Sequence, residues 1–265
     1  MTDDSARRLD LAEAWSDVMH ATVQAELYPE TGAAYLSVAG GYATYCGRPS
    51  PLNRACGLGM SGPMTAADLD TLEAFCGDRG VDTRVRVCPH ADVSLVRRLA
   101  ERGFALAEFM NVYARPVADP LSAESTPPGV EVRVANETEA RQWFELAGYA
   151  GDWAQPDGIA FMVIRTVLKP GARLFVAWKD GQPVGGGGLE IHEGVAALMA
   201  AATLPDYRRL GIHTALMRAR LVAAAEEGCD IAMAHTRPGA MSRGNVLRTG
   251  FQLRYTTVDV VRGRV

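Results

Sequence analysis

The stretch Thr203–Thr214 combines residue types that are suited to binding an anion. An apolar segment precedes it and an amphipathic one follows, so the pattern predicts a strand-to-helix junction. At such a junction the first backbone N–H groups of the helix have no partner, and the helix dipole adds partial positive charge. Arg208 and Arg209 contribute formal charge, and Gly211 allows successive amides to converge on one ligand. This combination favours a pyrophosphate as the ligand.

Two other phosphate-binding patterns do not occur in this junction. It has no Gly-Lys-Ser/Thr, which disfavours nucleotide hydrolysis, and no G-x-G-x-x-G, which disfavours a dinucleotide. The formal net charge of the chain is -4, so no global field attracts nucleic acid or anionic lipid. Any anion must therefore be held by local residues. An ordinary turn with two solvated arginines remains the alternative.

The length and composition are those of a globular protein. Of the 265 residues, 48% are hydrophobic and 22% are charged. The first residues are charged, and the apolar runs are too short to cross a bilayer. We expect a cytoplasmic protein without a nucleic acid, membrane or metal partner. The five cysteines form no C-x-x-C pair, and each is expected to be a small buried residue: Cys46, Cys56, Cys76, Cys88 and Cys229.

The C-terminal half is predicted to form a mixed sheet with helices on both faces, an α/β (α+β) fold. Hydrophobic periodicity and turn residues give the expected strands Val130–Val134, Leu174–Trp178, Val184–Ile191, Val195–Thr203, Ile231–His235 and Leu253–Val261. The expected helices are Glu137–Ala147, Pro156–Val167, Ile212–Glu227 and Ser242–Thr249. The apolar face of the helix after the junction is expected to include Leu216 and Val222.

A segment rich in Pro, Ser and Ala, residues 116–129, is predicted to be a linker. It would separate an N-terminal domain, residues 1–115, from a C-terminal domain, residues 130–265. Both halves contain a strand, a helix and then a Gly-Phe pair, which is Gly103-Phe104 in the first and Gly250-Phe251 in the second. A tandem duplication is a fair inference, and chance similarity of two strand-helix-strand units is the alternative.

The junction resembles the pyrophosphate loop of the GNAT superfamily of N-acetyltransferases, whose pattern is Q/R-x-x-G-x-G/A after a strand. Arg208 falls on the Q/R position and Gly211 on the first Gly. The later helix and its Gly250-Phe251 resemble the elements that close the cofactor cleft of that family. The resemblance covers roughly residues 129–265. It implies a GNAT-like, mostly antiparallel mixed sheet, in two tandem copies with a degenerate N-terminal one.

The resemblance also implies that acetyl-CoA, or another acyl-CoA, binds at the junction. The strand Val195–Thr203 would pair with the pantetheine arm, and the backbone N–H near Ala201 would polarise the thioester carbonyl. The following strand, Ile231–His235, must then splay away. The implied cofactor-binding residues are Ala201, Thr203, Arg208, Arg209, Leu210, Gly211, Ile212, His213, Thr214 and Asn245.

The reaction that the resemblance implies is direct attack of an amine on the thioester, without an acyl-enzyme. The candidate general bases are Glu190 and His192, near a hairpin, and His235, at the end of the splayed strand. Each could instead be a structural residue, Glu190 as an exposed hairpin carboxylate. Family members that use a Tyr as general acid carry it where this chain has Val246, and Tyr255 is the candidate substitute.

Several residues depart from the family pattern or stay ambiguous. His213 stands where the family has Gly or Ala, so its imidazole turns outward, donates to a phosphate or crowds the loop. Gly185–Gly188 would allow close approach of substrate or backbone, or would form a bulge of small residues. The Gly57–Pro63 stretch of the first half contains no basic residue, so that copy is expected to have lost cofactor binding.

The acceptor is not identified by the sequence, beyond a small-molecule amine or a protein amine. Residues that suggest a partly apolar acceptor pocket, or else core packing, are Trp143, Tyr149, Trp153 and Met162. Two further interpretations remain open: a non-catalytic acyl-CoA-binding or sensing module of the same fold, and an unrelated α/β protein that binds another phosphate ligand. A sheet without the splay would favour the last. The protein is expected to be a monomer or a homodimer.

Overall fold

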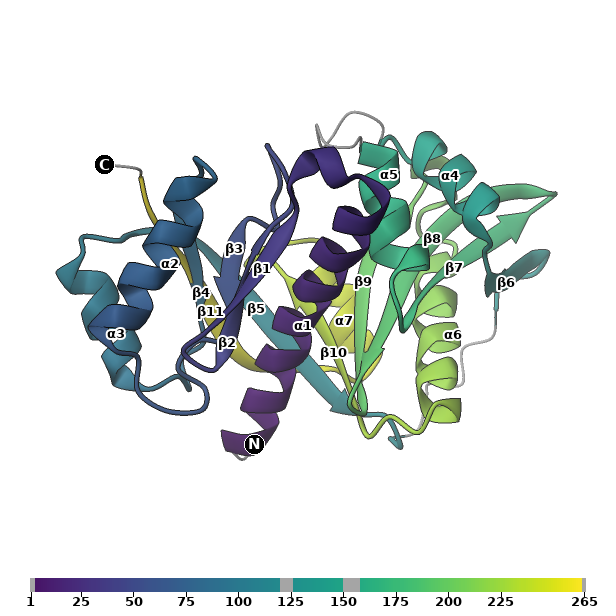
Figure 1. Cartoon of the computed structure of the whole chain (residues 1–265). Helices are drawn as coiled ribbons and strands as arrows, with labels where there is room; N and C mark the ends of the chain where they lie inside the picture. The colour runs from purple at the N-terminus through teal and green to yellow at the C-terminus, as the bar shows by residue number, and fades with distance from the viewer. Residues whose placement is uncertain (1–2, 120–125, 150–157, 264–265) are drawn as a thin grey trace. The chain divides into compact units, whose positions relative to one another are not determined.

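The computed structural model describes residues 3–119, 126–149 and 158–263 (Figure 1). They form two compact units. Unit 1 contains residues up to Asn111 and those from Tyr255 onward, and unit 2 contains residues between Val112 and Arg254. Within the described ranges, no helix has both the length and the apolar character needed to span a membrane.

Unit 2 contains the elements predicted for the C-terminal half. Its strands are β6 (Val130–Val134), β7 (Ala172–Lys179), β8 (Gln182–His192), β9 (Val195–Thr203) and β10 (Ile231–Thr236). Its helices are α4 (Glu137–Leu146), α5 (Gly158–Val163) with its π-helical continuation η2 (Ile164–Leu168), the 3₁₀ turn η3 (Pro205–Tyr207), α6 (Ile212–Glu226) and α7 (Ser242–Arg248). The expected start of the second helix at Pro156 lies outside the described residues.

The sheet of unit 2 confirms the predicted mixed, mostly antiparallel arrangement. Strands β6, β7, β8 and β9 are antiparallel neighbours, and β10 runs parallel to β9. The β9–β10 pairs extend from Val195 and Ile231 to Leu198 and Ala234. Strand β9 continues to Thr203, so its residues 199–203 extend past that pairing. The predicted separation of these two strands is therefore present.

Helix α6 packs across β6, β7, β8 and β9 (Figure 1). Ile212, Leu216 and Leu221 of this helix lie in the core of unit 2. Val222, expected on the same face, is instead 45% exposed. The buried face follows positions 212, 216 and 220, so a charged residue, Arg220, occupies a place where the periodicity predicts an apolar one.

The glycine run of β8 makes room for side chains of two helices. A Cβ at Gly186 would lie 2.3 Å from Nε1 of Trp143 in α4. A Cβ at Gly187 would lie 2.8 Å from Cζ of Arg220 in α6. Side chains of α4 and α6 thus lie close to these glycines. This close approach explains why the strand carries no larger residues there.

Unit 1 consists of a three-stranded antiparallel meander followed by two helix–strand units. Its helices are α1 (Asp3–Leu27), η1 (Pro29–Thr31), α2 (Ala66–Asp78) and α3 (Val93–Glu101). Its strands are β1 (Ala34–Val38), β2 (Gly41–Tyr45), β3 (Arg54–Cys56), β4 (Thr83–Val87), part of β5 (Ala105–Pro116) and part of β11 (Gln252–Arg262). Strand β4 is parallel to β3 through the pair Ala55 and Val85.

The division into units differs from the predicted boundary at residues 116–129. The last residues of β11, Val258–Arg262, pair antiparallel with β4 and so belong to unit 1. The end of β5, from Val112, belongs to unit 2, where the N–H of Val117 donates to the carbonyl of Asp230. The composition of residues 116–129 predicts a loop. It does not predict which unit the residues of β5 and β11 join through their hydrogen bonds.

The order of elements in the two units supports the inferred duplication. In each, an antiparallel meander leads through a helix to a strand parallel to the last strand of the meander: β3, α2 and β4 in unit 1, and β9, α6 and β10 in unit 2. A second helix and a Gly-Phe pair follow in both. Gly103 and Gly250 both have positive φ, 71° and 84°, where a left-handed residue ends the helix.

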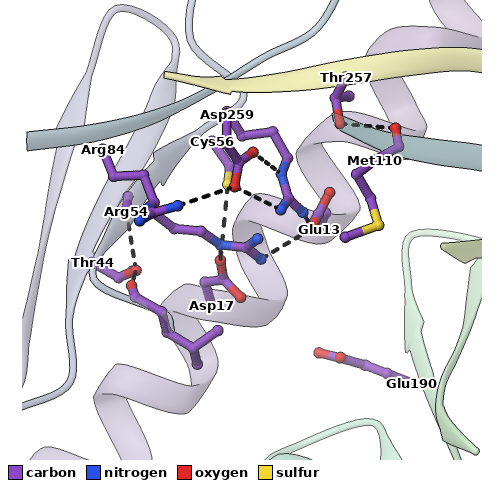
Figure 2. A network of polar contacts seen from close by, with 12 residues as sticks. Glu13, Asp17, Thr44, Arg54, Cys56, Arg84, Met110, Glu190, Thr257 and Asp259 are labelled. Atoms are coloured by element: carbon purple, nitrogen blue, oxygen red, sulfur yellow. Dashed lines mark hydrogen bonds and ion pairs between the residues drawn. The ribbon is translucent and has the colours of Figure 1, made fainter. Parts of the chain in front are cut away.

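A buried ionic network connects α1 to the sheet of unit 1, as Figure 2 shows. Arg54 contacts Asp17 at 2.7 Å and Glu13 at 3.0 Å. Arg86 contacts Asp259 at 2.7 Å and also binds Glu13. Buried arginines and carboxylates that satisfy one another in this way fix the position of α1 on the sheet.

The carboxyl group of Asp10, beside this network, predicts a pH dependence. Asp10 is 3% exposed, and its Oδ2 has no hydrogen-bond partner in the described chain. Burial, and then the charge of Glu13, raise the pKa of Asp10 to about 7. Because the folded pKa exceeds the unfolded one, the associated stability is present at low pH and is lost as pH rises through about 7.

Asp10→Asn should therefore be more stable than the wild type at pH 8, and this advantage should be smaller at pH 5, nearer the ordinary pKa of the carboxyl group. Thermal unfolding at pH 5, 6, 7 and 8 measures the difference. Asp4→Asn, an exposed position on the same helix, is the control and should leave the pH profile unchanged. A Tm difference between Asp10→Asn and the wild type that does not vary with pH would contradict the prediction.

Candidate functional site

The junction between β9 and α6 folds as a tight turn with an open helix N-terminus. Strand β9 ends at Thr203, and Arg209 and Gly211 both have positive φ, 64° and 82°. Gly211 is the N-cap of α6, and no side chain of the described residues caps this helix. The first turn of α6 also contains no acidic residue. The unpaired N–H groups and the positive end of the helix dipole are thus available to an anion.

The corresponding helix of unit 1, α2, has a capped N-terminus, whereas the N-terminus of α6 has no side-chain cap among the described residues. Thr65 and Asp68 form a capping box at the start of α2, in which each side chain accepts a hydrogen bond from the other residue's backbone N–H. The Asp68 carboxylate stands in the first turn, where it would repel a phosphate. This difference supports the expectation that only the C-terminal copy binds an anionic cofactor.

The loop side chains divide into exposed and anchoring ones. Arg208, Arg209 and Leu210 are exposed, and the Nε of Arg208 donates to the carbonyl of Thr203 at 3.2 Å. Ile212 is 1% exposed and anchors the helix in the core, while Thr214 is half-buried. The charged groups therefore face solvent beside the open amides, as a phosphate-binding loop requires.

Strand β9 has a bulge where its pairing with β10 ends. Gly188 pairs with Met199 and Gly186 pairs with Ala202, so two residues of β9 lie opposite one residue of β8. Ala200, within the bulge, has a φ of 49°, and the next residue, Ala201, is exposed. A bulge redirects the backbone groups of the strand, and here it does so beside a free strand edge.

Residues 136–251 match the model of the acetyltransferase (GNAT) family. This segment, which makes up most of unit 2, belongs to the GNAT acetyltransferase family. The matched segment spans β7–β10 and the whole junction, which are the elements that give unit 2 its separated strands and open helix N-terminus.

Solved structures share the fold over the whole chain. A GCN5-related N-acetyltransferase from Kribbella flavida is 20% identical, with a TM-score of 0.64 over 92% of this chain and 96% of that one. A tandem GNAT protein from the clavulanic acid biosynthesis pathway is 14% identical, with a TM-score of 0.61 over 95% and 94%. A Drosophila protein is 11% identical, with a TM-score of 0.53 over 100% and 97%. No curated protein matches the sequence.

His213, where other GNAT proteins have Gly or Ala, is partly buried in the first turn of α6. Its Nδ1 is buried and has no hydrogen-bond partner among the described residues. Burial, followed by the charges of Arg220 and Arg248, lowers the pKa of His213 to about 4. The imidazole is therefore neutral at physiological pH, so the formal charge at the junction comes from the arginines.

Asn245 lies in α7, half-buried, with its backbone carbonyl accepting from the N–H of Thr249 at 3.2 Å. Its side-chain Oδ1 accepts a hydrogen bond from Arg248. The adjacent Val246 is 4% exposed and lies in the core of unit 2. The position where many GNAT proteins have a proton-donating Tyr is thus apolar and buried in this chain.

Glu190 is a buried residue, not the exposed hairpin carboxylate that one interpretation of the sequence gave. It is 3% exposed, and its Oε2 lies 2.7 Å from the Nζ of Lys169, which is 1% exposed. Lys169 directly follows η2, and the pairing of β7 with β8 brings it next to Glu190 near the end of β8. Because the two residues are far apart in the sequence, this ion pair could not be predicted from it. As a base, Glu190 would have to act while bound to an ammonium group.

The other two candidate bases are half-buried at strand ends of unit 2. His192 ends β8, and burial lowers its pKa below the ordinary value, which keeps the imidazole neutral near pH 7. His235 lies at the end of β10, next to the separated part of β9. Both residues remain candidates for the base.

Tyr255, the candidate acid, belongs to unit 1, whereas the junction belongs to unit 2. Its ring packs edge-on against His90, with centroids 5.5 Å apart. Burial, followed by the charges of Asp10 and Cys88, raises the pKa of its hydroxyl well above the ordinary range. A phenol in this environment gives up its proton less readily, which weakens the case for Tyr255 as the acid.

The proposed acceptor-pocket residues mostly pack in the core. Trp143 is 0% exposed and Met162 is 4% exposed. The ring of Tyr149 packs edge-on against Phe144 at 5.3 Å. Trp153 lies outside the described residues. The core-packing interpretation is therefore confirmed for Trp143 and Met162. The five cysteines are likewise all buried, as expected, and form no disulfide in the described part of the chain.

Sequence reasoning did not predict three charged residues that the fold buries in unit 2, which are Arg115, Lys169 and Arg220. Charged residues are expected on the surface, so their burial was not considered. A signal for Arg220 was nonetheless present. It lies four residues after Leu216, on the apolar face of α6, and the glycine run of β8 leaves space for a large side chain.

Proposed function

We propose that this GNAT protein is an N-acetyltransferase that transfers the acetyl group of acetyl-CoA, or a related acyl group, to an amine. The observation that carries the proposal is the open N-terminus of α6 beside exposed Arg208 and Arg209. The same junction adjoins the part of β9 that extends past its pairing with β10. An anion site and a free strand edge thus follow one another along the chain.

The residues present fit an acyl-CoA. The amides at the start of α6 and the two guanidinium groups would hold the pyrophosphate, because together they offer donors and positive charge. The edge of β9 over residues 199–203 would pair with the pantetheine arm. The N–H of Ala201, beside the bulge, would donate to the thioester carbonyl and stabilise the negative charge that grows on its oxygen. Acetyl-CoA supplies the acetyl group as an activated thioester.

The chain must also handle two protons. The attacking amine has to be neutral and loses a proton, for which His192 and His235 are the candidate bases. The departing thiolate gains a proton, and with Val246 buried in the core, a water molecule is the proposed donor. The acceptor class, a small-molecule amine or a protein amine, is part of this proposal.

A second candidate function is a non-catalytic acyl-CoA-binding or sensing module. Two observations favour it: the apolar Val246 at the usual acid position, and the ion pair of Glu190 with Lys169. Neither residue belongs to the proposed cofactor site, but both observations reduce the number of groups that could transfer a proton. The two candidates therefore differ only in turnover.

The test is release of free thiol from acetyl-CoA in the presence of a panel of amines, covering small primary amines, polyamines and lysine-containing peptides. The proposal predicts release that depends on the amine, together with an acetylated product of matching mass. Gly211→Glu should abolish both, because it places a carboxylate at the N-cap. Tight binding of acetyl-CoA without amine-dependent thiol release would favour the sensing module.

A further inference from the structure

Arg220 is a buried cation without a carboxylate partner in the part of the chain that the structure describes. It is 0% exposed, and burial lowers the pKa of its guanidinium to about 9. Its hydrogen bonds go to backbone carbonyls: Nε donates to Leu216 at 3.0 Å, and Nη1 donates to Gly188 at 3.1 Å and to Met199 at 3.4 Å. Burying a charge without a counter-ion is costly, and Met or Leu would fill this space at lower cost.

The guanidinium lies at the point where β8 and β9 change register. Gly188 and Met199, whose carbonyls it binds, are paired with each other, and the next residues of β9 form the bulge. Gly187, opposite the bulge, has no side chain, and a Cβ there would lie 2.8 Å from Cζ of Arg220. Because Gly187 has no side chain, the guanidinium of Arg220 has room to lie next to the bulge.

The bulge requires support, because Ala200 has a φ of 49°. A non-glycine residue in the left-handed region costs about 1 kcal/mol or more and persists only where surrounding contacts hold it. Arg220 supplies such contacts through the carbonyl of Met199, the residue before Ala200. The residue after it is Ala201, which is exposed at the free edge.

We propose that Arg220 is a positioning residue for acyl transfer: it holds the Ala200 bulge, and with it the N–H of Ala201, and places a positive charge behind the carbonyl-binding edge of β9. This inference rests on the proposed function. In that reaction the amine nitrogen bonds to the acetyl carbon and the C–S bond breaks. The nitrogen loses one proton and the thiolate sulfur gains one. Arg220 acts through the backbone of β9 and makes no covalent contribution.

Infrared spectroscopy of bound [1-¹³C]acetyl-CoA, recorded without an acceptor amine, tests this role apart from turnover. Polarisation of the thioester carbonyl lowers its stretching frequency. The wild type should show a downward shift relative to acetyl-CoA in solution, and Arg220→Met should lose most of it while binding within about 3-fold of wild-type Kd. Arg220→Lys keeps the charge but not the fork geometry, so it should retain an intermediate shift. Where turnover is measurable, kcat of Arg220→Met should fall at least about 10-fold.

Two further variants separate this role from general stability. Gly187→Ala leaves Arg220 in place but displaces the end of its flexible side chain, so it should reduce the carbonyl shift and kcat at unchanged Kd. Arg218→Met is the matched control, because Arg218 lies on the same helix and makes no hydrogen bond to β8 or β9 among the described residues. It should leave the shift and kcat unchanged. If Arg220→Met does not fold, Gly187→Ala and Arg220→Lys decide the question.

A charge-specific readout is available at His213. The charge of Arg220 contributes to the low pKa of this imidazole, so Arg220→Met should raise the His213 titration midpoint from about 4, and Arg220→Lys should not. An unchanged carbonyl frequency and kcat in both Arg220→Met and Gly187→Ala would overturn the role of Arg220 alone. Absence of acetyl-CoA binding by the wild type would overturn the proposed function and this inference together.

Discussion

Arg86→Met should lower the free energy of unfolding of unit 1 by about 3–5 kcal/mol. The Arg86 side chain is 5% exposed and binds both Glu13 of α1 and Asp259 of β11. Removing it leaves the buried Glu13 with Arg54 alone and the buried Asp259 with only the more distant Arg84. Both carboxylates lose a close cation, which accounts for the expected loss. Urea unfolding followed by hydrogen exchange in the peptides of α1 and β4 measures the effect where it arises.

Arg84→Met is the control for this prediction. The side chain of Arg84 is 38% exposed and lies 3.8 Å from the same Asp259, so its loss should cost less than about 1 kcal/mol. Equal destabilisation by the two variants would mean that the network contributes no more than a surface ion pair. The comparison uses one chemical change on one strand, at a buried and an exposed position.

Lys169→Met should destabilise unit 2 by a similar amount, about 3–5 kcal/mol. Lys169 and Glu190 are both buried, and their charged atoms lie 2.7 Å apart. Removing the lysine leaves a carboxylate in the core at the end of β8. Hydrogen exchange of β7 and β8 measures the loss, and Lys179→Met, at the half-buried end of β7, is the control.

The double variant Lys169→Met/Glu190→Met distinguishes a structural pair from a functional one. Replacing both partners with apolar residues is often neutral, so the double variant should recover most of the stability that Lys169→Met loses. If its activity also recovers, Glu190 is not the general base. A double variant as unstable as the single one would contradict the assigned origin of the destabilisation.

Local patterns in the sequence predicted the elements that build the junction. The apolar run of β9, the glycine before α6 and the periodicity of that helix are short-range signals, because each depends on neighbouring residues along the chain. The separation of β9 from β10 was also expected, through the family resemblance, and the pairing that ends at Leu198 confirms it.

The sequence could not predict features that depend on pairing across the fold. Tyr255 follows Phe251 closely in the sequence, yet it belongs to unit 1, where the end of β11 pairs with β4. Glu190 was a candidate base or else an exposed hairpin carboxylate, and its buried ion pair was not predicted because its partner, Lys169, is distant in sequence. The burial of Arg220 could not be predicted for a different reason. Only the contacts of the β8 glycines show that the core of unit 2 accommodates a charged side chain there.

The central claim, that the β9–α6 junction binds the pyrophosphate of an acyl-CoA, is tested most directly by isothermal titration of acetyl-CoA at fixed moderate salt. The variants are Gly211→Glu, which adds a carboxylate at the N-cap, and Gly211→Ala, which imposes the same backbone strain at a φ of 82° without the charge. The account predicts binding by the wild type, weaker binding by Gly211→Ala, and a further loss of at least about 10-fold in Gly211→Glu. A wild type that does not bind acetyl-CoA, or a Gly211→Glu variant that binds it as tightly as Gly211→Ala, would contradict the account.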